Sequence, residues 1–297
     1  MTTGDGDAGG RLFPEDLDGV DPVAAVMLAD ACRSIAAYPE LVVAGALFTA
    51  AERVAGGWQV VCPCDPIPQG ARELLAEHLS DRAALADWIP GRELRAAARS
   101  LAGEPLDELR VAGSHFRIVR IEQVVRTGPD GPEPPRPTDR DPAPDDLRLR
   151  PCRPYDLIPD GQTTPDIATA ELLCQLLDAT AAGTATEPGA FLTPVLLSPA
   201  FTVAERTSGR WRPGGRLHDT PQQARDSLAT YFRHVVPAVE HPAAEELEEY
   251  TEAATQLSDR SRRNGLEVAG RRFRIVRIER IALMGAEGPE PPRPRDE

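Results

Sequence analysis

The chain contains nearly the same phrase twice, and this duplication constrains its fold more than any other feature. Residues 111–122 read VAGSHFRIVRIE, and residues 268–279 read VAGRRFRIVRIE. Each phrase is followed by the words Gly-Pro-Glu-Pro-Pro-Arg-Pro, at 131–137 and at 288–294. A repeat period above about 50 residues is longer than that of solenoid proteins. We therefore expect two tandem copies of one domain, packed as an internal pseudo-dimer.

The similarity extends well before these phrases. Residues 48–53 match residues 201–206, and Trp58 matches Trp211, in both cases at a separation of 153 residues. The closing phrases are 157 residues apart, so the second copy carries four extra residues between these points. Insertions of this kind belong in loops, which suggests that the structural elements themselves are shared.

Sequence periodicity predicts the same order of elements in each copy: a helix, a hairpin, two helices and a closing hairpin. In the first copy these elements are expected at 22–38, 41–53 and 58–62, from Pro68, at 91–101, and at 108–112 and 116–126. In the second copy, Thr164-Pro165 opens the first helix, Thr220 and Gln223 offer a capping box for the second, and an acidic third helix spans about 242–261. The fold class is α+β, with a mainly antiparallel four-stranded sheet in each copy and helices covering one face.

Composition divides the chain into domains and connections. We expect repeat domains at 21–126 and 164–284, a proline-rich linker at 127–163, a proline-rich tail at 285–297 and a disordered N-terminus at 1–20. The proline segments are interpreted as stiff exit segments laid along the sheet or helices. The alternative is a polyproline ligand for an aromatic groove in a partner, which would be bound through Pro291, Pro292, Arg293 and Pro294.

Charge and lysine content exclude several functional classes. The net charge is -14 over 297 residues, which disfavours nucleic acid and anionic membranes as partners. The sequence has no lysine, so Schiff-base, phosphate-loop and protein-kinase chemistry lack their amine. The acidic N-terminus and the lack of a long apolar run predict a cytoplasmic protein.

No motif predicts a metal, a cofactor or a disulfide. Cys62-Pro-Cys64 has a metal-like spacing, but a zinc site needs about four ligands and the sequence has no second cysteine pair. The glycines at 4, 6 and 9 match a dinucleotide fingerprint but follow no strand and lie among aspartates. His78 is in helical register with leucines and is interpreted as a packing residue. Nucleophile and metalloprotease signatures are missing too, so we assign no catalytic residue.

The closing strand of each copy carries the most notable charged residues. Its alternation is impure, because both faces are half apolar and both carry charges. This pattern is typical of a central strand between two packed layers. Arg120 and Glu122 in the first copy, and Arg277 and Glu279 in the second, are therefore interpreted as a structural arginine–glutamate network at the seam between the copies. They could instead line a pocket for an anionic ligand, since arginine pairs suit carboxylates and phosphates.

The phrase Phe-Arg-Ile-Val-Arg-Ile-Glu, the later Gly-Pro-Glu-Pro-Pro-Arg-Pro and the early Asp-Pro-Val-Ala-Ala-Val resemble an actinobacterial domain-of-unknown-function family of uncharacterised soluble proteins. The resemblance covers most of both copies. The resemblance implies an actinobacterial origin, which agrees with a chain that has arginine and no lysine. It implies no functional residue for this chain.

Three functional hypotheses follow. The first is a non-catalytic interaction or regulatory module, in which the proline segments or the groove between the copies bind a protein partner. The second is an enzyme or small-ligand binder with a pocket between the copies, lined by Arg120, Glu122, Arg277 and Glu279. The third is nucleic-acid binding through the basic runs at 260–263 and 271–274. The first is favoured, because a duplicated fold without a catalytic signature motivates it.

Overall fold

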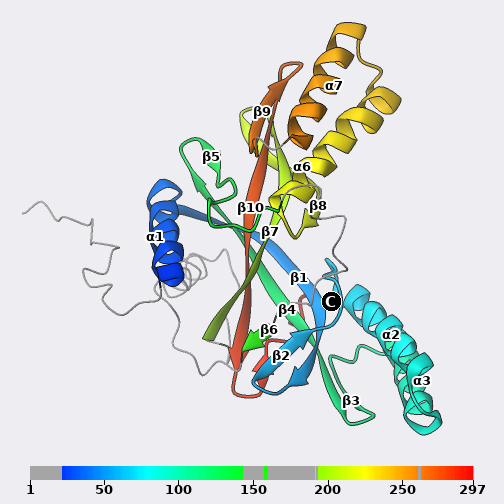
Figure 1. Cartoon of the computed structure of the whole chain (residues 1–297). Helices are drawn as coiled ribbons and strands as arrows, with labels where there is room; N and C mark the ends of the chain where they lie inside the picture. Colours follow the sequence, from blue (N-terminus) through cyan, green and yellow to red (C-terminus); the bar gives the residue numbers. More distant parts are fainter. Residues whose placement is uncertain (1–21, 143–156, 160–190, 192, 260–261, 297) are drawn as a thin grey trace, which may run out of the picture.

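The computed structural model describes residues 22–142, 157–159, 191, 193–259 and 262–296 (Figure 1). The segment predicted to be disordered, 1–20, lies outside the described residues. The helix expected from Thr164-Pro165 lies outside them as well.

The first half of the chain contains the elements that its periodicity predicts. The helix α1 begins at Pro22, as the Asp-Pro signal indicates, and the helices α2 and α3 are joined by a short turn. The bounds are α1 (Pro22–Ala37), β1 (Glu40–Val54), β2 (Gly57–Val60), α2 (Pro68–Leu85), α3 (Trp88–Gly103), β3 (Glu108–Val111), β4 (Ser114–Gly128) and β5 (Gly131–Pro132).

The second half of the described chain has elements in the same order from its first long strand onward. Thr220 caps the first helix described there by accepting a hydrogen bond from the backbone N–H of Gln223 at 3.2 Å, which is one of the two bonds of the predicted capping box, whereas the Gln223 side chain accepts from the backbone N–H of Asp219. That helix continues as a π-helix that contains Pro237. The bounds are β6 (Leu157–Pro159), β7 (Thr193–Thr207), β8 (Arg210–His218), α6 (Pro221–Thr230), η1 (Tyr231–Glu240), α7 (Ala244–Ser258), β9 (Gly265–Val268), β10 (Arg271–Gly285) and β11 (Gly288–Pro289).

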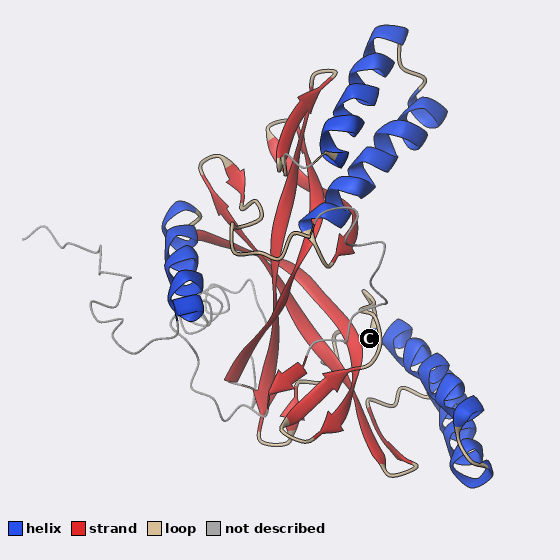
Figure 2. Cartoon of the chain, viewed as in Figure 1, coloured by secondary structure: helices blue, strands red, loops and turns tan. Residues whose placement is uncertain are grey.

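All described strands join one antiparallel sheet, so the four-stranded sheets expected for the two copies are continuous, a point that the sequence left open. Its main path runs β6-β2-β1-β4-β10-β7-β8. The two closing strands, β4 and β10, are neighbours at the centre and pair through Gln123 and Arg280. Each closing strand is 15 residues long, whereas its partner in the closing hairpin has only four residues. The middle of each closing strand therefore lies beyond that short partner, and Ile121–Val124 of β4 pair with Glu279–Ala282 of β10 in the centre of the sheet (Figure 2).

The helices lie in pairs toward the two ends of this sheet, and α1 lies apart from both pairs (Figure 1). The pair α2 and α3 covers one apolar core, which includes Leu75, Leu101 and Phe116. The helices α6, η1 and α7 cover another, which includes Phe232 and Phe273. Between them, Trp58, Ile158 and residues of both closing strands form a central cluster. In the described part of the chain, the helices fall short of the length and hydrophobicity needed to cross a membrane.

Candidate functional site at the crossed exit segments

The segments that follow the two closing strands cross over to the opposite half of the sheet. The first exit segment is defined as residues 131–141 and the second as residues 288–296. The backbone N–H of Arg277 donates to the carbonyl of Glu133 at 2.9 Å. The backbone N–H of Arg120 donates to the carbonyl of Glu290 at 2.8 Å. Each exit segment therefore binds the closing strand of the other half.

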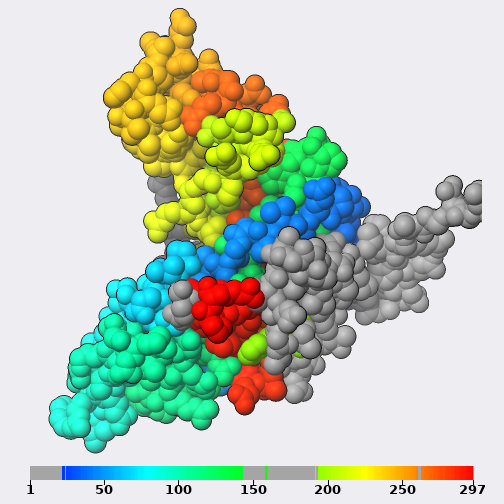
Figure 3. Space-filling model, turned by 180° about the vertical axis from the view of Figure 1, so that it is seen from behind, coloured from blue at the N-terminus to red at the C-terminus, as the bar shows by residue number. Residues whose placement is uncertain are grey.

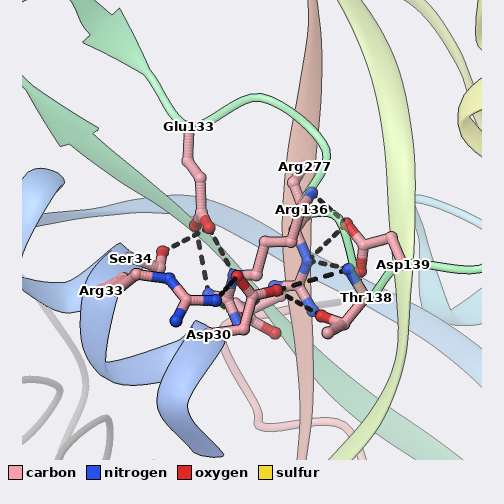
Figure 4. Close-up of polar contacts among 9 residues, drawn as sticks. Asp30, Arg33, Ser34, Glu133, Arg136, Thr138, Asp139 and Arg277 are labelled. Carbon is pink, nitrogen blue, oxygen red and sulfur yellow. Dashed lines mark hydrogen bonds and ion pairs between the residues drawn. The ribbon is translucent and has the colours of Figure 1, made fainter. Parts of the chain in front are cut away.

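Arg277 and Glu279 lie under the first exit segment, and Figure 4 shows Arg277 beside Asp139 of that segment. The Arg277 guanidinium donates from Nε to both carboxylate oxygens of Asp139 at 3.0 Å and also pairs with Glu279. Arg136 donates from Nη2 to Glu279 Oε1 at 2.9 Å, and from Nε to Glu133 at 2.5 Å. Arg277 and Glu279 are each only 7% exposed. The two residues are thus enclosed by charges of the exit segment.

Arg120 and Glu122 have matching surroundings under the second exit segment. Arg120 donates from Nε to Asp296 Oδ2 at 2.9 Å and also pairs with Glu122. Arg293 lies 3.6 Å from Glu122 Oε1 and donates from Nε to Glu290 at 2.6 Å. Figure 3 shows this C-terminal segment, in red, on the surface of the half that carries α2 and α3.

The electrostatics of these clusters favour the charged forms of Arg120, Arg277 and Glu279. Burial alone would lower the pKa of Arg120 and Arg277. The nearby carboxylates outweigh burial and raise both pKa values; the largest such contribution comes from Glu122 at Arg120 and from Glu279 at Arg277. Burial alone would raise the pKa of Glu279, but Arg277 and Arg136 outweigh it, so this pKa is lowered. Asp139 differs, because burial outweighs the attraction of Arg277 and raises its pKa.

A tryptophan of the opposite half covers the start of each exit segment. A Cβ atom on Gly131 would lie 2.1 Å from Trp211 Nε1, and one on Gly288 would lie 2.8 Å from the Trp58 ring. Arg274 stacks on Trp211 with its Cζ 4.9 Å from the ring centroid, and Arg117 stacks on Trp58 at 5.2 Å. These arginines also donate to the exit segments, Arg274 to the carbonyl of Pro132 at 2.8 Å and Arg117 to that of Pro289 at 3.2 Å.

The helix α1 holds the first exit segment from its other side. Asp30 accepts hydrogen bonds from the Thr138 hydroxyl and, at 3.0 Å, from Arg33, while Ser34 donates to Glu133 (Figure 4). Burial alone would raise the pKa of Asp30, but these hydrogen bonds outweigh it and lower the pKa. The first exit segment is therefore enclosed between α1 and β10.

The structure brings Arg120 together with Glu122, and Arg277 together with Glu279, within one strand each. It places Pro291, Pro292 and Arg293 half-buried on the opposite half, and Pro294 exposed. The expected partner segment is thus in part engaged by the chain itself. A surface groove lies elsewhere, between α2 and α3, and is lined by Glu77, Asp81, Arg95 and Arg99 among others.

The remaining candidate residues do not assemble into a site. Cys62 is buried, and burial together with Glu77 raises the pKa of its thiol to about 12. Among the described residues, no group of three or more histidine, cysteine or carboxylate side chains could hold a metal ion. His78 packs edge-on against Phe116, and burial with nearby Arg82 lowers its pKa.

Our reading of the sequence missed the aspartates and glycines that complete the clusters. Asp139 and Asp296 stand 157 residues apart, as do Gly131 and Gly288. This is the separation of the closing phrases. The repeat therefore extends to the aspartates, and tracing it to the end of each proline segment would have identified them.

Comparison with known proteins identifies a family and no relative of known function. The model of DUF5954, described as a family of unknown function, matches residues 21–297. No curated protein and no solved structure matches the chain.

Proposed function

We propose, for a chain that belongs to the DUF5954 family of unknown function, a non-catalytic interaction or regulatory module built from a duplicated domain. The two repeat domains are taken as 21–126 and 164–284, joined by a linker at 127–163. A cytoplasmic location is part of this proposal, which the buried free thiol of Cys62 supports.

The pairing at the seam supports an internal pseudo-dimer. Glu122 pairs with Ile281, and Val124 pairs with Glu279. Glu279 is the equivalent of Glu122, and Ile281 is the equivalent of Val124, each 157 positions further along, so exchanging the two copies turns one pair into the other. Gln123 pairs with its own equivalent, Arg280, at the centre. A pairing that maps onto itself in this way is the mark of a two-fold, isologous interface.

The observation that carries the proposal is that the exit segments already pair the arginines and glutamates of the closing strands. A free anionic ligand would need open guanidinium donors. Arg120 and Arg277 instead direct theirs to Asp296, Glu122, Asp139 and Glu279. This argues against the alternative of a ligand pocket at these residues. It also argues that a partner binds elsewhere than at Pro291–Pro294, whose segment holds the fold together.

A substrate and ligand screen tests the proposal. We expect no turnover of general hydrolase and transferase substrates, and no thermal shift with a panel of anionic metabolites. Turnover that is lost in the Glu279→Gln or Arg277→Leu variant, while the variant stays folded, would overturn the proposal. A metabolite that raises the melting temperature of the full chain, but not that of the Arg120→Leu variant, would support the ligand pocket instead.

A further inference from the structure

The two outer edges of the sheet differ in what covers them. On one side, β6 pairs with β2 and places Ile158 opposite Trp58. On the other side, β8 pairs with β7 on its inner side, and no described residue pairs with its outer side. Among the described residues, none occupies the position at β8 that is equivalent to the position of β6 at β2.

The backbone of β8 is oriented to receive a strand there. Ser208 and Gly209 both have positive φ, as a tight two-residue hairpin turn requires, and Thr207 pairs with Arg210 next to the turn. Hydrogen-bonded and non-hydrogen-bonded pairs alternate along an antiparallel ladder. The next residue, Trp211, therefore directs its backbone N–H and C=O outward, toward the uncovered side.

The burial of the two equivalent tryptophans shows the effect of the missing strand. Trp58 is fully buried and shares a core cluster with Ile158, which is fully buried too. Trp211 is only half-buried, although Arg274 and Gly131 pack against it as Arg117 and Gly288 pack against Trp58. An apolar residue opposite Trp211 would complete the environment that Trp58 has.

The uncovered edge is also basic within an acidic protein. Arg206, Arg210, Arg212 and Arg216 are exposed, and none of them has an ion pair with a described residue. In the first half, near the covered edge of β2, the positions equivalent to Arg210, Arg212 and Arg216 hold the uncharged residues Gly57, Gln59 and Pro63. Edge arginines repel the same edge of a second copy. At the same time they attract carboxylates.

We propose that the outer edge of β8 binds an extended acidic segment of a partner protein by strand addition. The segment places an apolar residue opposite Trp211 and carboxylates opposite Arg210 and Arg212, because directly opposed side chains share one face of a sheet. The sequence around β6 has the same character, since Asp156 and Asp160 flank Leu157–Pro159. This inference rests on the proposed function and names its binding surface and its class of partner.

A labelled peptide tests the proposal on the full chain. The probe is a ten-residue peptide with Asp-Glu-Ile-Glu-Asp at its centre, measured by fluorescence anisotropy. We expect saturable binding that weakens at least tenfold in the double variant Arg210→Glu, Arg212→Glu. The matched control, Arg92→Glu with Arg99→Glu on α3, makes the same charge change on another surface and should alter the Kd less than twofold. Thermal melts confirm that both double variants fold.

A second peptide separates strand addition from simple charge attraction. Replacing the central isoleucine by proline keeps the charge but removes the N–H that pairs with the edge, so binding should fall at least tenfold. Equal binding of both peptides, equal weakening by both double variants, or no binding at millimolar peptide would overturn the proposal.

Two other occupants would also overturn it. One is a second copy of the chain, which would be seen as self-association that is lost in the Arg210/Arg212 variant. The other is the chain's own N-terminus, which would be seen as tighter peptide binding after residues 1–20 are removed. Failure of the peptide test without turnover in the substrate screen would remove the edge site and leave the proposed function standing.

Discussion

At the scale of single residues, the buried arginine–carboxylate clusters determine how sensitive the protein is to substitution. Arg277 is shielded from water and faces two carboxylates, whereas Arg272 pairs with Glu267 at the surface. A buried charge that loses its partner bears the full cost of desolvation. An exposed pair contributes little, because water screens it.

We predict that Glu279→Gln lowers the free energy of unfolding by about 3 kcal/mol, because it removes the carboxylate that Arg277 and Arg136 share and leaves the buried cluster one negative charge short. The control Glu267→Gln breaks the exposed pair with Arg272 and should cost about 0.5 kcal/mol or less. Urea denaturation of both variants measures the difference. Equal costs would show that the seam cluster does not stabilise the fold.

The glycines under the tryptophans give a second residue-scale prediction. Gly288→Ala should destabilise the protein by about 1–3 kcal/mol more than Gly270→Ala. Both glycines have positive φ and so carry a backbone cost, which is larger at Gly288, where φ is +125° against +72° at Gly270, and only at Gly288 would the new Cβ meet a ring, that of Trp58. Thermal melts of the two variants should separate clearly. Similar melting temperatures would mean that Trp58 does not pack on Gly288.

At the scale of elements, the two halves use different partners for an equivalent buried arginine. On α2, Arg72 binds Asp107 at 2.8 Å. On α6, Arg225 binds Asn264, the equivalent of Asp107, at 3.0 Å and takes its carboxylate from Asp141 of the first exit segment at 2.6 Å. The exit segment therefore supplies a charge that the second half lacks.

This exchange predicts a rescue. Asp141→Asn should destabilise the protein by about 2–3 kcal/mol, because Arg225 is buried. Adding Asn264→Asp should recover more than half of that loss, since it restores the pairing seen at Arg72. A double-mutant cycle by chemical denaturation measures the coupling. Additive effects of the two substitutions would contradict the exchange.

The lowered pKa of Glu279 predicts an acid sensitivity of the exit segments. A carboxylate with a lowered folded-state pKa contributes stability above its ordinary value of 4.5, and loses it as the pH falls through the folded pKa. Asp139 acts in the opposite sense, because the fold favours its protonated form, so its pairing with Arg277 weakens first. We expect unfolding free energy to fall below about pH 4.5, and less steeply in Glu279→Gln. Parallel pH profiles of the two proteins would refute this.

Most individual elements could be predicted from sequence, and their assembly could not. The start of α1 at Pro22 and the cap at Thr220 follow from local turn chemistry, which neighbouring residues determine. The π-helix around Pro237 was not foreseen, because a proline signal alone does not distinguish a helix end from a distortion. Arg120 and Glu122 were expected at a seam, but their partners Asp296 and Arg293 are remote in the sequence.

At the scale of the whole molecule, the exit segments make each half depend on the other. Removing residues 286–297 should expose the closing strand of the first half rather than that of the second, because Arg120, and not Arg277, donates its amide to Glu290. Hydrogen exchange should show lost protection at the Arg120 amide and retained protection at the Arg277 amide. Asp296→Asn offers a milder version if the truncated chain does not fold. Loss of protection confined to β10 would contradict the crossed arrangement.

The sequence by itself determined the order of the elements, the position of most of their ends and the repeated motif in the two exit segments. Those properties depend on contacts between near neighbours, which leave a periodic pattern. Only the tertiary structure decided that β4 and β10 join one sheet, that each exit segment crosses to the opposite half, and that β8 has no second strand partner among the described residues. Pairing between strands more than a hundred residues apart depends on the length and twist of the strands and on which edges are already covered, and no local pattern records it.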